Sequence, residues 1–483
     1  MSNSCHALRI TLQLVPNWET LGGGHDKVGP SRIHTPCYNQ NLSMAHIIPF
    51  RALRYDPKQV SAAQVLTQPY DKITPRMQDR YYAASPYNLV RIILGRREDK
   101  DNPEHNVYSR AASYFREWRQ QGILRQDADP SLYTYSQTLP GQGTSSALER
   151  RGFIALGRLE DYATGVVFRH EQTLAKPKAD RLDLVRATRA HFEQLFMLYE
   201  DSGDIDSLLF EDSGANSNAI MEVTDEYGVL HRVWQIADPR VVDTVRSQMR
   251  DKKLIIADGH HRYETALNYR NERRPAPSAG GHASSADAPY EFAVMTFINM
   301  SGPGLVILPT HRVVRGLAAF SVDSFLNSSR AFFAIDELDP AIGPARATSI
   351  LREASPAETA LVAVTANRAF RLHRLKGSGS QVLAGLSPRQ QSLDVVQLHK
   401  FLLEGVLALS EESIREQRNI SYMRDAGDAF AQVRSGSANI TFLMNPCSID
   451  QMREVAFAGE VMPQKSTDFY PKLLSGLTIY ALE

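Results

Sequence analysis

The stretch LIIADGHHRYE, residues 254–264, passes from an apolar run to six polar or ionisable side chains around one glycine. The apolar run predicts a buried β-strand that ends at Asp258, and the residues after Gly259 predict the start of a helix. Backbone N–H groups at a helix start have no partner inside the helix, and the helix dipole favours an anion there. The stretch therefore predicts a strand-to-helix corner that suits a phosphate or a catalytic site.

The side chains of this corner add further chemistry. Arg262 can bind a phosphate or carboxylate through two hydrogen bonds, and His260 and His261 can transfer protons near neutral pH. Asp258 can orient a histidine or hold Mg²⁺. A structural interpretation stays open, in which Asp258 caps the helix, one histidine packs in the core and Arg262 pairs with Glu264 or a distant carboxylate.

Composition indicates a globular protein that acts on small molecules. A chain of 483 residues, 43% of them hydrophobic, is long enough for two domains. Its 54 basic and 54 acidic residues balance, so we expect no nucleic-acid partner and no binding to membrane surfaces. Three cysteines without CxxC spacing support neither a zinc knuckle nor a disulfide scaffold. No apolar run approaches the roughly 20 residues of a membrane span, and we expect a cytoplasmic location.

The pattern along the chain predicts a mixed α and β (α+β) fold. Residues 1–43 lack a helical or strand period and predict a flexible extension. A first domain is expected over 44–318, followed by a smaller α/β C-terminal domain over 319–483. The clearest elements are helices at 107–121, 181–198, 239–251 and 394–409, strands at 132–137, 152–159, 254–258 and 291–300, a strand pair at 360–366 and 370–375, and a surface loop at 272–289.

A second polar cluster, RHEQTLAKPKADR, occupies residues 169–181. His170 and Glu171 form a pair capable of acid/base chemistry. Lys178 and Arg181 place positive charge at the start of the next helix, which favours an anion. Position 174 is leucine, so the cluster is not the HExxH motif of zinc proteases. A solvated charged loop capped by the aspartate at 180 is the open alternative.

Shorter polar pieces occur elsewhere in the chain. The sequences QPYDK at 68–72 and SPYNLVR at 85–91 are interpreted as turn-to-strand junctions, the first of which presents Asp71. PTHR at 309–312 closes a strand with a polar corner. MPQKST at 462–467 suits phosphate chemically but lacks the glycines of a P-loop.

These motifs together resemble a known family. PYDKI, SPYNLVRI, HEQTLAKPKADRL, IADGHHRYETALNYR, LPTHR and MPQKSTDFYPKLLSGL occur in this order in the domain-of-unknown-function 1015 family, from about Met44 to the C-terminus. The DGHHR corner resembles a segment of free serine kinases in the ParB/sulfiredoxin superfamily. The resemblance implies a ParB/sulfiredoxin-like catalytic region with a mixed sheet over 44–318 and a C-terminal domain that contributes the MPQKST element.

The resemblance also implies an activity and its site. We expect a phosphotransferase acting on a small hydroxylated metabolite, most closely a nucleotide-dependent free L-serine kinase, with ATP or ADP as donor and Mg²⁺ on Asp258. The catalytic residues implied are Glu171 or Asp71 as the base, with His170 and His261. The residues implied for phosphate and nucleotide are Asp258, Gly259, His260, His261, Arg262, Lys178, Arg181, His311, Arg312, Lys465, Ser466 and Thr467.

One consequence is geometric: segments 170–181, 258–264, 309–312 and 465–472 should line one cleft. Two alternative functions stay open. A metal-dependent hydrolase would use the ligand set His170, His260, His261, His311 and Asp258. A nucleotide-binding regulatory module of the ParB type would bind without catalysis.

Overall fold

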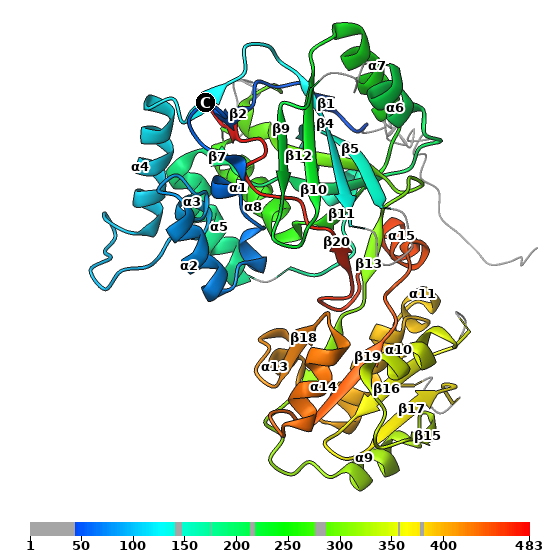
Figure 1. Cartoon of the computed structure of the whole chain (residues 1–483). Coiled ribbons are helices and arrows are strands. Elements are labelled where there is room, and N and C mark those ends of the chain that lie inside the picture. The colour runs from blue at the N-terminus through cyan, green and yellow to red at the C-terminus, as the bar shows by residue number, and fades with distance from the viewer. Residues whose placement is uncertain are drawn as a thin grey trace, which may run out of the picture. The chain divides into compact units, whose positions relative to one another are not determined.

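The computed structural model describes residues 44–140, 147–173, 175–212, 218–275, 286–355, 358–376 and 381–483, which belong to one compact unit. The predicted extension over 1–43 and most of the predicted 272–289 loop lie outside the described residues. Helices and strands alternate along the chain, and the strands form several sheets, which confirms the α+β class (Figure 1). None of the described helices is both long and apolar enough to cross a bilayer.

The largest sheet is mixed and has nine strands. β12 runs parallel to β8 and antiparallel to β5, while β11 runs antiparallel to β8 and parallel to β6. Along the path of the sheet the strands are β6 (Val167–Phe168), β11 (Leu254–Asp258), β8 (Leu195–Tyr199), β12 (Phe292–Asn299), β5 (Leu148–Arg158), β4 (Leu132–Leu139), β10 (Leu230–Ile236) and β9 (Met221–Thr224), with β1 (Ile47–Ile48) on β5.

Both faces of this sheet are covered by apolar side chains. On β5, Phe153 and Ala155 belong to one buried cluster, whereas Ile154 and Leu156 belong to another. This follows from the two-residue period of a strand, which sends alternate side chains to opposite faces. All eight residues of β12 are buried, as expected of a strand with a core on each side.

Among the helices up to residue 273, α4 begins at a clear N-cap. α4 starts at the N-cap Asn106, whose side chain accepts from Tyr108 N and Ser109 N, and it buries Ala111 and Trp118, so the predicted helix is confirmed. The helices are α1 (Ala62–Val65), α2 (Pro75–Ala84), α3 (Val90–Ile93), α4 (Val107–Gln120), α5 (Ala175–Thr188), α6 (Asp204–Ser207), α7 (Pro239–Met249) and α8 (His260–Arg273), with 3₁₀ turns η1 (Tyr70–Lys72), η2 (Tyr162–Thr164) and η4 (Pro289–Glu291) and a π-helical segment η3 (Leu208–Asp212).

A second sheet of six strands is antiparallel throughout. The predicted strand pair is confirmed as β16 and β17. The order is β15 (Ala334–Leu338), β17 (Ala369–His373), β16 (Ala360–Val364), β19 (Ile440–Met444), β14 (His311–Val314) and β18 (Ile420–Met423). The accompanying helices are α9 (Val322–Ser329), α10 (Pro344–Arg352), α11 (Pro388–Gln391), α12 (Asp394–Gln397), the π-helix η6 (Leu398–Val406), α13 (Glu411–Arg415), α14 (Ala426–Arg434) and α15 (Ile449–Phe457). The domain division at residue 318 stays a prediction.

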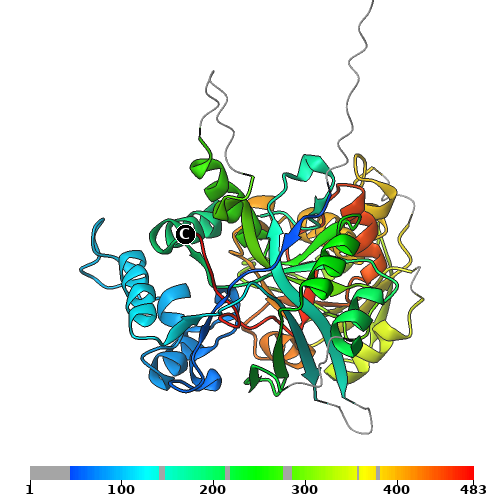
Figure 2. The ribbon, with the colours of Figure 1, turned by 90° about the horizontal axis from the view of Figure 1, so that it is seen from above.

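After α15 the chain returns to the elements of its first part. β20 (Asp468–Tyr470) pairs antiparallel with β13 (Val306–Leu308), and β21 (Tyr480–Ala481) pairs with β7 (Ala190–His191). Ile479 also bridges to Leu53, the first residue of β2 (Leu53–Tyr55), which itself pairs with β3 (Leu124–Gln126). Figure 2 shows this red segment running among the blue N-terminal strands.

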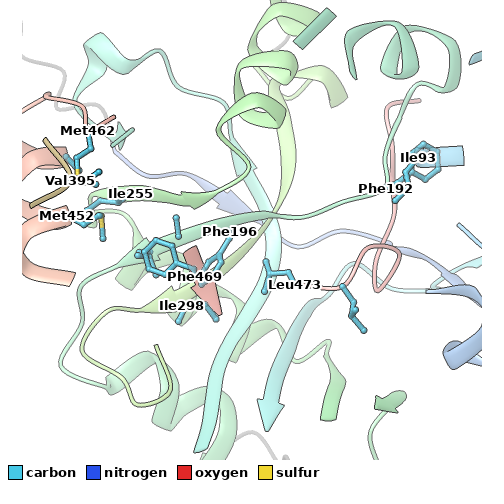
Figure 3. Close-up of a cluster of buried hydrophobic side chains, with 14 of the residues drawn as sticks. Ile93, Phe192, Phe196, Ile255, Ile298, Val395, Met452, Met462, Phe469 and Leu473 are labelled. Carbon is cyan, nitrogen blue, oxygen red and sulfur yellow. The ribbon is translucent and has the colours of Figure 1, made fainter. Parts of the chain in front are cut away.

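Apolar side chains hold the returning segment in place. The ring centroid of Phe469 on β20 lies 5.6 Å from that of Phe196 on β8. Figure 3 shows Phe469 beside Phe196 and Ile298, within a buried cluster that also contains Ile255 of β11. The side chains on either side of Phe469 are therefore kept at the end of the large sheet, where β11 turns into α8.

Three local predictions were wrong. The helix predicted over 181–198 ends at Thr188, because Arg189 adopts a left-handed backbone (φ 48) and the following apolar residues form β7 and β8. The two predicted turn-to-strand junctions, 68–72 and 85–91, lead into η1 and α3 instead. In α3 the β-branched residues are fully buried, so tertiary packing overrides their strand preference.

Close packing of β5 against β12 generates a stability prediction. A Cβ at Gly152 would collide with the carbonyl oxygen of Phe297 and the Cδ1 of Ile298, whereas a Cβ at Gly343 would meet nothing within 4 Å. We predict that Gly152→Ala lowers the free energy of unfolding by about 1–3 kcal/mol. The control Gly343→Ala should stay within about 0.5 kcal/mol of the parent. Urea unfolding measures both, and equal values for the two variants would contradict the packing described here.

Candidate functional site

The predicted strand-to-helix corner is present. β11 ends at Asp258 and α8 begins at His260, with Gly259 between them at φ 94, a backbone conformation that L side chains rarely adopt. A Cβ at Gly259 would lie 3.0 Å from Nη2 of Arg262. Glycine is therefore required for the chain to turn from the sheet into the helix while the arginine packs against it.

A cavity of about 580 Å³ lies at this corner. Each of the four segments expected to line one cleft contributes at least one residue to its wall. The contributions are Glu171 from the first segment, Asp258 and His260 from the second, Thr310 from the third, and Lys465, Thr467, Asp468, Tyr470, Pro471 and Lys472 from the fourth. Gln68, Asp71, Lys72, Asp225, Tyr227, Ala257, Gln417, Ser421, Tyr422, Met423 and Arg424 complete the wall.

Lys472 is the central cation of the wall. Its side chain is 7% exposed, and its Nζ lies 2.9 Å from Oδ1 of Asp258 and 3.1 Å from Oδ1 of Asp468. Asp468 also pairs with Arg424 at 2.6 Å and with Lys72 at 3.5 Å. The lysine thereby links the end of β11 to β20, which lie more than 200 residues apart in the sequence.

Electrostatics keeps these groups charged. Burial alone raises the pKa of Asp468, but Lys472, Lys72 and Arg424 outweigh it and lower the pKa to about 2. The pKa of Asp258 is likewise raised by burial and lowered more strongly by Lys472 and Arg262, so it ends well below its usual range. Burial lowers the pKa of Lys472, and the two carboxylates reverse this and raise it to about 12.

Burial favours the neutral form of the histidines at the site. Nε2 of His170 lies 2.8 Å from Oγ1 of Thr467, and the rings of His170 and His260 meet edge to face with centroids 4.7 Å apart. Burial, with a contribution from His260, lowers the pKa of His170 to about 3, and burial lowers the pKa of His260 to about 4. Burial also lowers the pKa of His261, although Glu171 opposes it. Uncharged imidazoles of such low pKa are weak bases near pH 7.

The segment Val461–Thr467, called the strap below, is held in a strained conformation. Lys465 has φ 58, although it is not glycine. Its backbone N–H donates to Oε1 of Glu171 at 2.6 Å, and its carbonyl oxygen accepts from Nη2 of the buried Arg312 at 3.1 Å. Ser466 Oγ donates to the carbonyl oxygen of Pro463. Strained residues of this kind cost about 1–3 kcal/mol and cluster at functional sites.

Several predicted residues support the wall without lining it. Arg262 donates to Oδ2 of Asp258 at 2.8 Å and to the carbonyl oxygen of Gln194. The structural interpretation of the corner had expected Glu264 or a distant carboxylate as its partner and Asp258 as the helix cap, whereas the N-cap is Gly259. Lys178 pairs with Glu264 at 2.7 Å. Two further predicted residues outside the wall are Arg181, which donates to the Ile93 carbonyl oxygen and stacks on Tyr70, and His311, whose Nδ1 accepts from Met444 N at 3.4 Å.

Sequence reasoning missed several wall residues. Lys72, Asp468 and Lys472 lie within motifs that the sequence singled out, yet only their neighbours were selected. Asp225 and Tyr227 come from the β9–β10 hairpin, and Ser421, Tyr422 and Arg424 come from β18 and the residue after it. Nothing local in the sequence marks these two groups, because sheet pairing alone brings them to the cavity.

Buried polar groups fix the backbone of the wall. Nε2 of Gln137 donates to the carbonyl oxygen of Lys472 at 2.8 Å, and Nη1 of Arg150 donates to that of Tyr470 at 3.2 Å. Arg150 is fully buried, and this burial lowers its pKa to about 10. Breaking one of these hydrogen bonds would leave an unpaired polar group in the interior, which is unfavourable. The hydrogen bonds therefore hold the backbone of the wall in place.

The described residues contain no group of three or more His, Cys, Asp or Glu side chains that could hold a metal ion. Asp258 does not suit the magnesium role expected of it, because its two oxygens already accept from Lys472 and Arg262. The histidine set proposed for a metal-dependent hydrolase is not gathered either: His170 and His260 touch, whereas His311 bonds to the second sheet.

The ion pairs of Lys472 generate a testable prediction. Lys472→Met would leave Asp258 and Asp468 without their shared cation, so the free energy of unfolding at pH 7 should fall by about 3 kcal/mol. The control Lys100→Met removes an exposed pair with Glu98 and should cost at most about 1 kcal/mol. Urea unfolding of the three proteins measures the difference.

The same variant has a pH dependence. The stability due to the depressed pKa of Asp468 is complete above its unfolded value, 3.8, and is lost as the pH falls toward about 2. The gap between the parent and Lys472→Met should therefore be smaller at pH 3 than at pH 7. A gap that does not change with pH would contradict the charge pairing of this wall.

The chain is distantly similar to several solved structures. A search of curated proteins finds no match to the sequence. Solved structures with distant similarity include a free serine kinase in complex with AMP (12% identity, 65% of this chain and 89% of that chain, TM-score 0.34). Others are a conserved hypothetical protein from Pyrococcus furiosus (12%, 65% and 91%, 0.32) and SbnI with C-terminal truncation from Staphylococcus aureus (9%, 67% and 87%, 0.32).

The family model described as "Protein of unknown function (DUF1015)" matches residues 47–396, which is more than half of the chain. The matched range includes the corner at Asp258 and the polar cluster that contains Glu171. The chain therefore belongs to the DUF1015 family.

Proposed function

We propose that this protein is a nucleotide-dependent phosphotransferase that phosphorylates the hydroxyl group of a small metabolite, with free L-serine as the first acceptor to test. The observation that carries the proposal is the composition of the cavity wall, in which the start of α8 lies beside Lys472, Lys465 and Glu171. Its volume of about 580 Å³ suits one small-molecule site, because such sites span roughly 300–1,000 Å³.

Phosphoryl transfer depends on positive charge and N–H donors around the transferred group. The wall supplies four cations, namely Lys72, Lys465, Lys472 and Arg424. The start of α8 directs N–H groups and the positive end of the helix dipole toward the cavity wall, a geometry that favours a phosphate. In the present arrangement Asp258 and Asp468 neutralise Lys472, so a bound phosphate would share that lysine with them.

Glu171 is the proposed base for the acceptor hydroxyl. Its Oε1 accepts the backbone N–H of Lys465, which fixes the carboxylate next to a lysine that also lines the cavity. The exposed Asp71 is the alternative base on the same wall. His170 and His260 serve better as neutral hydrogen-bonding groups, because burial lowers the pKa of both.

ATP or ADP is the proposed donor. Mg²⁺ in such sites is held by phosphate oxygens, waters and one or two carboxylates. Asp71 is the wall carboxylate proposed for that role, since Glu171 is the proposed base, Asp258 and Asp468 hold cations, and Asp225 accepts from His231 and Gln68. When bound, the ion would neutralise charge on the phosphates.

The decisive experiment incubates the full chain with ATP or ADP, with and without Mg²⁺, and a panel of hydroxylated metabolites that includes L-serine. Mass spectrometry and ³¹P NMR detect a phosphorylated product. We expect product with at least one donor and one acceptor. If no donor gives a product and neither nucleotide binds in calorimetry, the proposed function is wrong.

The base assignment gives a sharper prediction. Glu171→Gln keeps the shape of the side chain but removes its charge, so kcat should fall about 10²- to 10⁴-fold. The Kd of the nucleotide should change by less than about threefold, because the carboxylate acts on the acceptor. Glu200→Gln, which alters only an exposed pair with Arg453, is the matched control. If Glu171→Gln keeps its turnover, Asp71 becomes the proposed base, and Asp71→Asn is the variant to test next.

The phosphate role of the strap can be tested separately. Lys465→Met should weaken nucleotide binding by about 1.5–3 kcal/mol, which is roughly 10-fold or more, because a charged hydrogen bond to phosphate is lost. Lys100→Met is the control for the loss of one positive charge. Equal affinities of Lys465→Met and the parent would exclude Lys465 from the nucleotide site.

A further inference from the structure

A second, smaller cavity lies next to the strap. Its volume is about 240 Å³, and its wall includes Val461–Gln464 of the strap together with Gln172 and His399. The next residue of the strap, Lys465, and the residue before Gln172, Glu171, line the first cavity. Adjacent residues of two segments therefore contribute to the two cavities.

His399 gives this second cavity a polar group without a partner. The residue is only 5% exposed, and its Nε2 has no hydrogen-bond partner among the described residues. An unpaired polar atom in the interior costs about 1–3 kcal/mol. Such a group is explained when a ligand completes its hydrogen bond. Nε2 itself has almost no accessible surface, so a ligand in this cavity would reach it only after η6 or the strap has shifted.

The backbone that carries His399 is unusual. It lies on the π-helix η6, Leu398–Val406, where Lys400 and Glu404 pair across one turn at 2.8 Å. π-Helical turns are rare and occur frequently at functional sites. The sequence pattern predicted an ordinary amphipathic helix here, so the wider turn is a local departure that places His399 and Lys400 on the cavity wall.

The composition of the wall indicates the kind of ligand. Two cations and two carboxylates line it, and Lys400 and Glu404 neutralise each other, which leaves the exposed Arg415 and Glu411 of α13. Apolar contacts come from Val396, Ile414 and Met462, among others. A wall with both charges and an apolar surface suits a zwitterion with an apolar side chain rather than a phosphate.

We propose that this second cavity binds a free α-amino acid with an apolar side chain, and that its occupancy regulates the first cavity. The carboxylate of the ligand would pair with Arg415, its ammonium with Glu411, and one of these two groups would also complete the hydrogen bond of His399. The regulatory part rests on the proposed function of the first cavity, whereas the binding part does not.

The contacts of the strap supply the coupling. The backbone N–H of Met462 donates to the carbonyl oxygen of His170 at 2.8 Å, and that of Lys465 donates to Glu171. Arg312 binds the carbonyl oxygen of Lys465 and lies close enough to His399 to lower its pKa, after the larger effect of burial. A ligand that shifts the strap would therefore change the position of Lys465 and Glu171.

Binding is tested first, by calorimetry on the full chain with L-leucine as the probe. 4-Methylpentanoate and 3-methylbutylamine each lack one of its two charges. We expect L-leucine to bind and both analogues to bind at least about 10-fold more weakly. His399→Leu and Arg415→Ala should each weaken L-leucine binding by a similar factor. Arg418→Ala, another exposed arginine just beyond α13, should not.

Arg415 is exposed, so Arg415→Ala tests the site even if His399→Leu fails to fold. The proposal is overturned if no apolar amino acid binds at millimolar concentration, or if L-leucine binds Arg415→Ala as well as the parent. Glu171→Gln should bind L-leucine like the parent. This result separates the second cavity from the acceptor site of the first.

Regulation is tested by measuring nucleotide Kd with and without L-leucine. The two ligands must change each other's affinity by the same factor, because binding coupling is reciprocal. A factor of at least about 5 that disappears in Arg415→Ala supports the proposal. L-leucine binding without any effect on nucleotide affinity would overturn the regulatory part. Absence of phosphorylated product together with intact L-leucine binding would overturn the proposed function and the regulatory part that rests on it, and would leave the binding part standing.

Discussion

The bridge of Lys472 between Asp258 and Asp468 holds the candidate site together. One carboxylate ends β11 of the large sheet, and the other begins β20 on the returning C-terminal segment. Taking three charges out of water is unfavourable unless each finds opposite charge at close range. Arg262 and Arg424 complete that requirement on the two sides. Arg424 directly follows β18, so this charge pattern joins the corner, the returning segment and the second sheet at one cavity.

The local part of this arrangement can be read from the sequence, and the long-range part cannot. LIIADGHHRYE predicts the strand, the glycine turn and the helix because apolar period, backbone freedom and helix start all lie within 11 residues. Asp225 and Arg424 reach the wall only through strand pairing in different sheets. The helix predicted over 181–198 was wrong for a related reason, since burial in the sheet decides the state of its second half.

Burial also redistributes roles among the side chains of the motifs. The histidines at 170 and 260 were expected to transfer protons, yet a site that excludes water favours their neutral forms. Arg262 and Arg312 were expected at phosphates; in this structure they hold a carboxylate and a backbone carbonyl oxygen, and their phosphate role stays a prediction. Residue type indicates which chemistry is available, whereas depth and neighbours decide which residue can perform it.

The residues that line the first cavity are spread along the chain from Gln68 to Lys472. Bringing such distant positions together costs the entropy of closing the long loops between them. A ligand in this cavity therefore binds the complete fold and has no equivalent site on the unfolded chain. By mass action it would add about 2.7 kcal/mol to stability at 100 times its Kd. The concentration of that ligand in the cell would then help to set how much of the protein is folded at any moment.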